Sequence, residues 1–138
     1  MKFVFYLLFG LLTTTNLFSQ TILDKWKTID DETGKAKSIV NIYESEGKVY
    51  GEITEILTKN KDAVCSKCKG DKKNKPILGL NIIEGLSKND DIYEGGTITN
   101  PENGKVYNCR LKLKDNSTLQ VRGYVAFFYK TQYWKRVD

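Results

Sequence analysis

The stretch GGTITNPENGKVYNCRLKLKDNSTLQVRGYV, residues 95–125, decides the fold of this chain. From Tyr107 to Leu113 the odd positions are apolar and the even positions are polar. Successive side chains of a strand point to opposite faces, so this alternation predicts a strand with one buried face and one solvated face. Residues 118–122 repeat the alternation. We therefore expect an antiparallel meander in this stretch.

Two turns interrupt the stretch. Asn103 and Gly104 are residues that accept positive φ angles, so they predict a tight primed hairpin turn, with Pro101 at the end of the preceding strand. Asp115-Asn116-Ser117 predicts the second turn. Gly123 stands inside a strand pattern, which indicates a bulge or a close approach of another backbone.

The rest of the chain repeats this design. Strand-like segments are spaced at roughly 8 to 12 residues outside one long loop at residues 59–76, which argues for an all-β barrel or sandwich. For residues 77–86, periodicity does not separate a strand from a helical turn, and we favour a strand. The expected strands, about eight in all, cover residues 21–29, 37–44, 49–57, 77–86, 92–99, 105–113, 118–124 and 131–137.

The N-terminus has the features of a secretory signal peptide. Lys2 precedes an apolar run at residues 3–12, and a small residue, Ser19, precedes the predicted cleavage point. The alternative, a transmembrane anchor, needs about 20 apolar residues and is disfavoured by length. We therefore expect a signal peptide at residues 1–19, export to the periplasm or beyond, no remaining membrane span, and a single domain at residues 20–138.

The chain has three cysteines. In an exported protein Cys65 and Cys68 are expected to form a disulfide that fixes the long loop, and Cys109, on the apolar face of its strand, is expected to be a buried thiol. The alternative is a C-x-x-C redox pair, which is disfavoured because this one lies in a lysine-rich loop of a β domain.

The absence of histidine restricts the possible chemistry. With 0 histidines among 138 residues, Ser-His-Asp and Cys-His catalysis and histidine-ligated zinc or haem are excluded. The acidic clusters fall in predicted turns, where carboxylates bond their own backbone. We expect no enzyme activity, no metal and no cofactor.

Two binding surfaces remain. The interior of an eight-stranded barrel is either filled by side chains or able to hold one small ligand. Inward-pointing tyrosines together with Arg122 would suit an amphipathic ligand. The candidate ligand-binding residues are Tyr107, Leu111, Val121, Arg122 and Tyr124.

The second surface is a basic patch in the long loop, which would attract an envelope protein or another anionic surface. The whole chain also carries a positive formal net charge, +5. It contains no aromatic residue, so single-stranded nucleic acid is not expected as a partner. The patch consists of Lys67, Lys69, Lys72, Lys73 and Lys75.

The residues also resemble a known family. The chain resembles the secreted bacterial domain-of-unknown-function family 2147, whose members look like lipocalin or calycin barrels. The motifs that carry the resemblance are Lys25-Trp26, Gly47-Lys48-Val49-Tyr50-Gly51, Cys65-Ser66-Lys67-Cys68-Lys69-Gly70, Pro76-Ile77-Leu78-Gly79-Leu80, Gly95-Gly96-Thr97-Ile98, residues 101–104 with Tyr107-Asn108-Cys109, Val121-Arg122-Gly123-Tyr124, and residues 131–137.

The resemblance implies an up-and-down antiparallel barrel, export, and no catalytic residues to carry over. By analogy with lipocalins, Trp26 packs against a basic residue of the closing strand, for which Arg136 is the candidate. Asp24 stands where the lipocalin-like pattern commonly has a glycine, two residues before the tryptophan.

These observations favour a non-enzymatic binding module for a small, partly apolar ligand. The alternative is a structural or interaction protein of the cell envelope, with a filled core, that contacts partners through residues 59–76. Under either function, the residues that we expect to be structurally important are Trp26, Arg136, Gly104 and Gly123.

Overall fold

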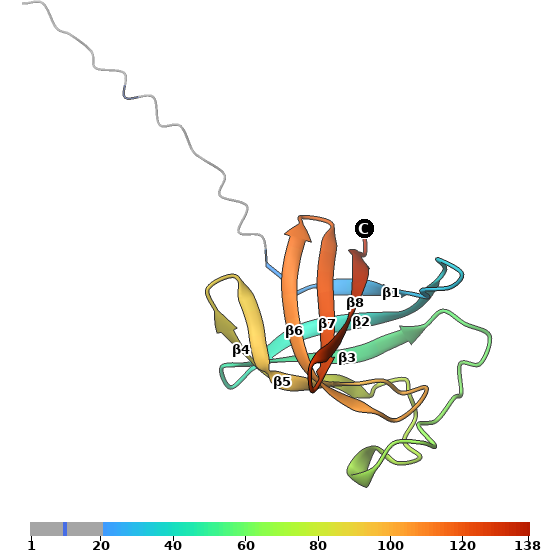
Figure 1. The fold of residues 1–138 in the computed structure, drawn as a ribbon. Coiled ribbons are helices and arrows are strands. Elements are labelled where there is room, and N and C mark those ends of the chain that lie inside the picture. The colour runs from blue at the N-terminus through green and yellow to red at the C-terminus, as the bar shows by residue number, and fades with distance from the viewer. Residues whose placement is uncertain (1–9, 11–20) are drawn as a thin grey trace, which may run out of the picture.

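The alternating segments of the sequence form a closed antiparallel barrel in the computed structural model, which describes Gly10 and residues 21–138 (Figure 1). The predicted signal peptide at residues 1–19 lies outside the described residues, apart from Gly10. The strands of the described part are β1 Lys25–Ile29, β2 Ala36–Ser45, β3 Lys48–Ile56, β4 Asn81–Asn89, β5 Ile92–Thr99, β6 Val106–Asp115, β7 Thr118–Val125 and β8 Phe128–Arg136. The predicted fold class is confirmed.

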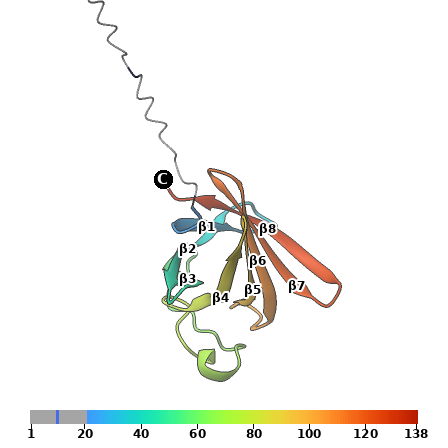
Figure 2. The same ribbon diagram turned by 90° about the vertical axis from the view of Figure 1, so that its left-hand side faces the viewer.

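Each strand pairs with the next one along the chain, and β1 pairs with β8 to close the barrel. Residues 77–86 are mostly strand, as we favoured, because β4 begins at Asn81. Within residues 21–138 the helical structure is the 3₁₀ turn Gly70–Lys72, and no helix there is long and apolar enough to cross a membrane. Figures 1 and 2 both show the long loop between β3 and β4 extending from one end of the barrel.

The turn between β5 and β6 differs from the predicted two-residue hairpin. It spans residues 100–105 and closes with hydrogen bonds from Asn100 N to Lys105 O (2.9 Å) and from Gly104 N to Asn100 O (2.8 Å). Gly104 has a φ of 71°, as predicted, whereas Asn103 is not among the residues with positive φ. The side chain of Asn103 instead accepts the backbone N–H of Lys105 (2.9 Å), which stabilises the longer loop.

Gly123 allows a close approach rather than forming a bulge. It pairs in regular register with Cys109 on β6 and Lys130 on β8. A Cβ atom at Gly123 would lie 3.2 Å from the Cβ of Tyr107, which is closer than most packed carbons. The glycine therefore makes room for the Tyr107 side chain inside the barrel.

The core lies along the inward positions of the strands, with Val40, Ile83, Leu86, Leu111 and Leu119 among its most buried side chains. Cys109 is buried and unbonded, as expected. Burial raises the pKa of its thiol to about 12, so the thiol stays protonated and acts as a small apolar group.

Candidate ligand-binding cavity

One end of the barrel is closed around Trp26. Its indole N–H donates to Ile22 O (2.9 Å), and the guanidinium carbon of Arg136 lies 4.3 Å from the centre of its ring. The expected contact between Trp26 and Arg136 is confirmed. Arg136 also bonds Asp24 Oδ2 (2.7 Å) and the backbone oxygen of Asn116 (2.7 Å). This one side chain joins β8 to the N-terminal segment and to the β6–β7 turn.

Asp24 therefore has a defined role at the closed end. It occupies the position of the glycine in the lipocalin-like pattern, and its carboxylate accepts from Arg136 and from the backbone N–H of Lys25 (2.8 Å). Partial burial raises the pKa of Asp24, but these hydrogen bonds and the nearby positive charges outweigh the burial and hold the pKa below its ordinary value.

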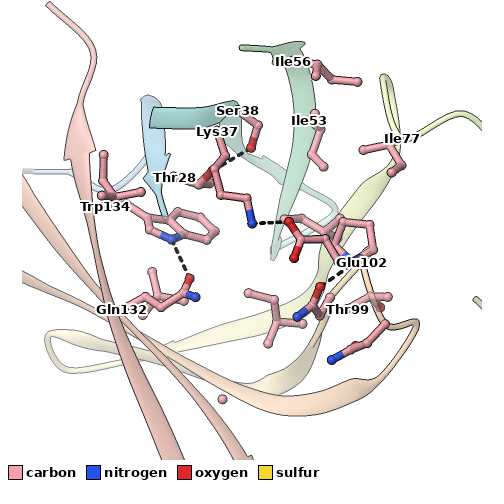
Figure 3. A pocket seen from close by; sticks show the side chains of 18 of the residues that line it. Thr28, Lys37, Ser38, Ile53, Ile56, Ile77, Thr99, Glu102, Gln132 and Trp134 are labelled. Atoms are coloured by element: carbon pink, nitrogen blue, oxygen red, sulfur yellow. Dashed lines mark hydrogen bonds and ion pairs between the residues drawn. The ribbon is translucent and has the colours of Figure 1, made fainter. Parts of the chain in front are cut away.

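The opposite end of the barrel is hollow. A cavity of about 410 Å³ opens between the β1–β2, β3–β4 and β5–β6 connections and the strands β7 and β8. Figure 3 shows its wall, with Ile53, Ile56 and Ile77 on one side and Trp134 on the other. The apolar lining residues are Ile29, Ile53, Ile56, Ala63, Ile77, Ile82, Ile98, Pro101, Val121 and Trp134, together with the ring of Tyr107.

Polar side chains surround the apolar lining, mostly paired with one another. Lys37 and Glu102 form an ion pair, Thr28 and Ser38 share a hydrogen bond of 2.7 Å, and these contacts appear as dashed lines in Figure 3. Trp134 donates its indole N–H to Gln132 Oε1 (3.2 Å). We call these polar side chains the rim of the cavity. Because their charges and hydrogen-bonding groups are already paired with one another, the rim favours a ligand head group that forms hydrogen bonds over one that needs a full counter-charge.

The wall of the cavity has a weak side between β1 and β8. In the described part of the chain these strands pair only at Trp26↔Arg136 and Lys27↔Lys135, near the closed end. Toward the open end, Asp31 bridges the two strands through Lys130 (3.0 Å) and Gln132 (3.3 Å). The hydrogen bond to Asp31 raises the pKa of Lys130, so this side chain stays charged.

The structure brings part of the predicted site together. Tyr107 and Val121 line the cavity, whereas Leu111 is buried inside the barrel but is not among the cavity-lining residues. The inward placement of Arg122 and Tyr124 is wrong, because on β7 the positions that point inward are those of Leu119, Val121 and Gly123.

The outer face of the barrel holds the two misplaced side chains. Arg122 donates to Thr131 Oγ1 (3.1 Å) and lies 4.8 Å from the ring centre of Tyr129. Tyr124 lies 5.3 Å from the guanidinium carbon of Arg110 and packs beside Tyr129. Neither side chain contacts the cavity.

The long loop is docked against the open end. Cys65 and Cys68 are joined by a disulfide, as expected. A Cβ atom at Gly104 would clash with the backbone oxygen of Lys67, so the loop and the β5–β6 turn are in direct backbone contact. Lys72 of the predicted basic patch pairs with Glu84 (2.7 Å), and the other four lysines of that patch are exposed.

The rim residues were not found from the sequence. Lys37, Glu102 and Lys130 lie on three different hairpins and meet only when the barrel closes. Their local sequence contains no signal beyond turn chemistry. Within residues 21–138 no cluster of three or more metal-ligating side chains is present.

Comparison with known proteins agrees with the geometry. The profile of the family described as "Uncharacterized protein conserved in bacteria (DUF2147)" matches residues 24–136. A solved structure of similar fold is that of protein HP1028 from Helicobacter pylori, described as belonging to the lipocalin family, with a TM-score of 0.75 and 23% sequence identity. The likeness covers 86% of this chain and 84% of that one. No curated protein sequence matches the chain.

Proposed function

This chain belongs to the DUF2147 family and has a lipocalin-like barrel, and on that premise we propose that it is an exported, non-enzymatic binding protein for a small, partly apolar ligand. The observation that carries the proposal is the cavity of about 410 Å³ at the open end. Its volume falls within the range of about 300–1,000 Å³ that is usual for small-molecule sites.

The cavity sets the size and polarity of the ligand. A water-sized group takes about 30 Å³ of a liquid, so the cavity has room for a ligand of roughly a dozen non-hydrogen atoms. Isoleucines and Trp134 form most of its apolar wall, and they favour an apolar body. The hydrogen-bonding side chains of Thr28, Ser38 and Gln132 lie at the rim, so the ligand's polar group faces the opening.

Trp134 provides a direct measurement of ligand binding. We expect a series of straight-chain alcohols of about six to twelve carbons to change the fluorescence of the purified protein saturably, with the strongest binding at an intermediate length set by the cavity. In a Trp134→Phe variant the signal should vanish, because Trp26 is not among the residues that line the cavity. Calorimetric titration of the same variant then checks that binding itself persists.

The natural ligand should co-purify with the protein. Solvent extracts of the natively purified protein, examined by mass spectrometry, should contain a reproducible small molecule that is missing from a Val121→Phe variant, whose new ring would occupy the cavity. No co-purifying molecule, together with no saturable alcohol binding, would end the carrier proposal.

Export is part of the same proposal. When the full chain, including residues 1–19, is expressed in a Gram-negative host, the protein should be recovered from the periplasm. Its mass should be that of a chain that begins at Gln20. Recovery of the full-length chain in the cytoplasm would contradict export through this segment.

The second candidate function is an envelope interaction module that uses residues 59–76. It is favoured by the rigidity of this loop, which the disulfide, the Val64↔Pro76 bridge and the Lys72–Glu84 pair hold in place. Replacing Lys67, Lys69, Lys73 and Lys75 by glutamine should abolish capture of a specific partner from envelope extracts. Unchanged capture would reject this function and leave the cavity as the functional site.

A further inference from the structure

The tip of the β7–β8 hairpin exposes large apolar side chains. Phe127 is 98% exposed and Phe128 is 80% exposed, and Val125 and Tyr129 beside them are also more than half exposed. Figure 2 shows the hairpin extending away from the body of the barrel. Single exposed apolar residues are ordinary in soluble proteins, but a contiguous group on a projecting hairpin marks an interaction surface.

The outer face of the same sheet is basic and aromatic. Lys114 lies 4.9 Å from the ring centre of Tyr133, which continues the row formed by Arg110 over Tyr124 and Arg122 over Tyr129. Arg110 pairs with Glu94, but within the described residues neither Arg122 nor Lys114 has a carboxylate partner. Arg122, which pairs with Thr131 three positions from the Val125↔Phe128 pair, therefore leaves uncompensated positive charge on the tip half of the hairpin, whereas Lys114 lies beside the β6–β7 turn at the other end of the sheet.

The inner face of the hairpin leads from the tip to the cavity. Gly123 and Lys130, which pair across the hairpin, line the cavity at its mouth. The same face continues two residues further to the pair Val125↔Phe128 at the tip. The inner face of the tip thus leads to the opening of the cavity, past Lys130 and its ion pair with Asp31.

We propose that the β7–β8 tip docks on a lipid bilayer that contains anionic lipids and so brings the mouth of the cavity to the membrane surface. Aromatic side chains partition into the interfacial region of a bilayer, and arginine and lysine near the surface are attracted to anionic head groups. A nucleic-acid partner would use the tyrosines but not the projecting Phe127, which has no basic residue as a sequence neighbour. The docking goes beyond ligand binding and does not depend on it.

Vesicle flotation tests the proposal with the purified chain beginning at Gln20. We expect the protein to float with vesicles of phosphatidylcholine containing about 30% phosphatidylglycerol and much less with phosphatidylcholine alone, because the attraction is partly electrostatic. The double variant Phe127→Ser/Phe128→Ser should lower the partition coefficient about tenfold or more. Leu78→Ser, which changes an exposed apolar residue of the long loop, should leave it unchanged.

A second pair of variants tests the charges. Arg122→Gln should lower partitioning to the anionic vesicles roughly fivefold, with little effect on phosphatidylcholine vesicles, whereas Lys114→Gln, at the far end of the sheet, should have a much smaller effect. Lys73→Gln removes an exposed lysine of the basic loop and should have no effect. A Phe127→Trp variant adds an independent signal, since its fluorescence should shift to the blue when anionic vesicles are added.

Three results would overturn the proposal. They are no flotation with either lipid mixture, undiminished flotation of the double phenylalanine variant, and sensitivity to Lys73→Gln instead of Arg122→Gln. The single variant Phe127→Ser serves as the control in case the double variant does not fold. Its side chain is so exposed that it adds little to the core, so its loss should leave folding unchanged. Flotation of Val121→Phe at the wild-type level would show that docking is separate from occupancy of the cavity.

Discussion

Trp26 and Trp134 lie close together on the paired strands β1 and β8, where Trp26 pairs with Arg136, two positions from Trp134, yet they have different surroundings. Trp26 is enclosed by the N-terminal segment and the Arg136 guanidinium, with its indole N–H bonded to a backbone oxygen. Trp134 is equally buried, but one side of it borders a cavity of about 410 Å³. The contrast teaches that burial alone does not identify core, because a buried side chain can belong either to the packed half of a barrel or to a binding site.

The largest expected effect lies at the closed end. Trp26→Ala should lower the free energy of unfolding by about 3–5 kcal/mol, because it removes a fully buried aromatic side chain and the surface on which Arg136 stacks. Urea denaturation measures the loss. Trp26→Phe, which keeps most of the ring volume, should cost clearly less. A loss below about 1 kcal/mol for the alanine variant would mean that this end is not tightly packed.

The open end depends on loop docking, which a matched pair of glycine variants isolates. Gly34 and Gly104 both lie in turns at this end with φ angles of 72° and 71°. A Cβ at Gly34 meets nothing within 4 Å, whereas at Gly104 it clashes with the backbone of Lys67. Gly34→Ala should therefore cost about 1 kcal/mol of stability from the backbone conformation alone.

Gly104→Ala should cost about 1–3 kcal/mol beyond the Gly34→Ala loss, because the long loop must move away from the β5–β6 turn. Urea denaturation gives both values. Hydrogen exchange of the Cys65 and Asn74 amides, which are bonded within the loop, should accelerate only in Gly104→Ala. Equal stability losses in the two variants would show that the backbone contact is unimportant.

Two positions on the inward face of β7 compare the two halves directly. Leu119 lies in the packed half, and Val121, two residues along, lines the cavity. Leu119→Phe should destabilise by about 1–3 kcal/mol through overpacking. Val121→Phe adds more volume but has empty space to occupy, so it should cost less than about 1 kcal/mol while abolishing alcohol binding. Equal losses at the two positions would argue against an open cavity.

The packed half and the strand order were predictable because they follow from local patterns. Alternation around Cys109 and Leu111 placed both inside, and the resemblance paired Trp26 with Arg136, as the structure confirms. The same alternation also assigns Arg122 to the polar face of β7. The prediction that Arg122 points inward was wrong because it relied on the charge that a ligand would need and ignored the two-residue period of a strand.

The open end was less predictable because its residues meet only through long-range register. Asp31 and Gln132, which bond across the β1–β8 seam, are 101 positions apart in sequence. Whether a barrel is hollow depends on the summed volumes of side chains from all its strands, and no local pattern encodes that sum. The tip phenylalanines are visible in the sequence, but their exposure depends on how far the hairpin projects.

The smallest expected effect concerns the charge that secures the closed end. The pKa of Asp24 is lower in the folded chain than its ordinary value, so its ionised form stabilises the fold. This contribution is fully present above the unfolded pKa of about 4 and is lost as the pH falls through the lower folded value. Because the Asp24 side chain is 44% exposed, solvent screening limits the contribution to less than about 1 kcal/mol.

Asp24→Asn should therefore destabilise the protein by up to about 1 kcal/mol near pH 7, and the difference from wild type should shrink toward zero as the pH is lowered to about 3. Urea denaturation at both pH values measures it. Asp91→Asn removes an exposed carboxylate 3.7 Å from Lys112 and should change stability little at either pH. If the loss in Asp24→Asn were the same at both pH values, the shape of the side chain rather than its charge would hold Arg136 over Trp26. The closed end would then owe its stability to packing alone, which would make its contrast with the solvated, ion-paired rim of the open end sharper still.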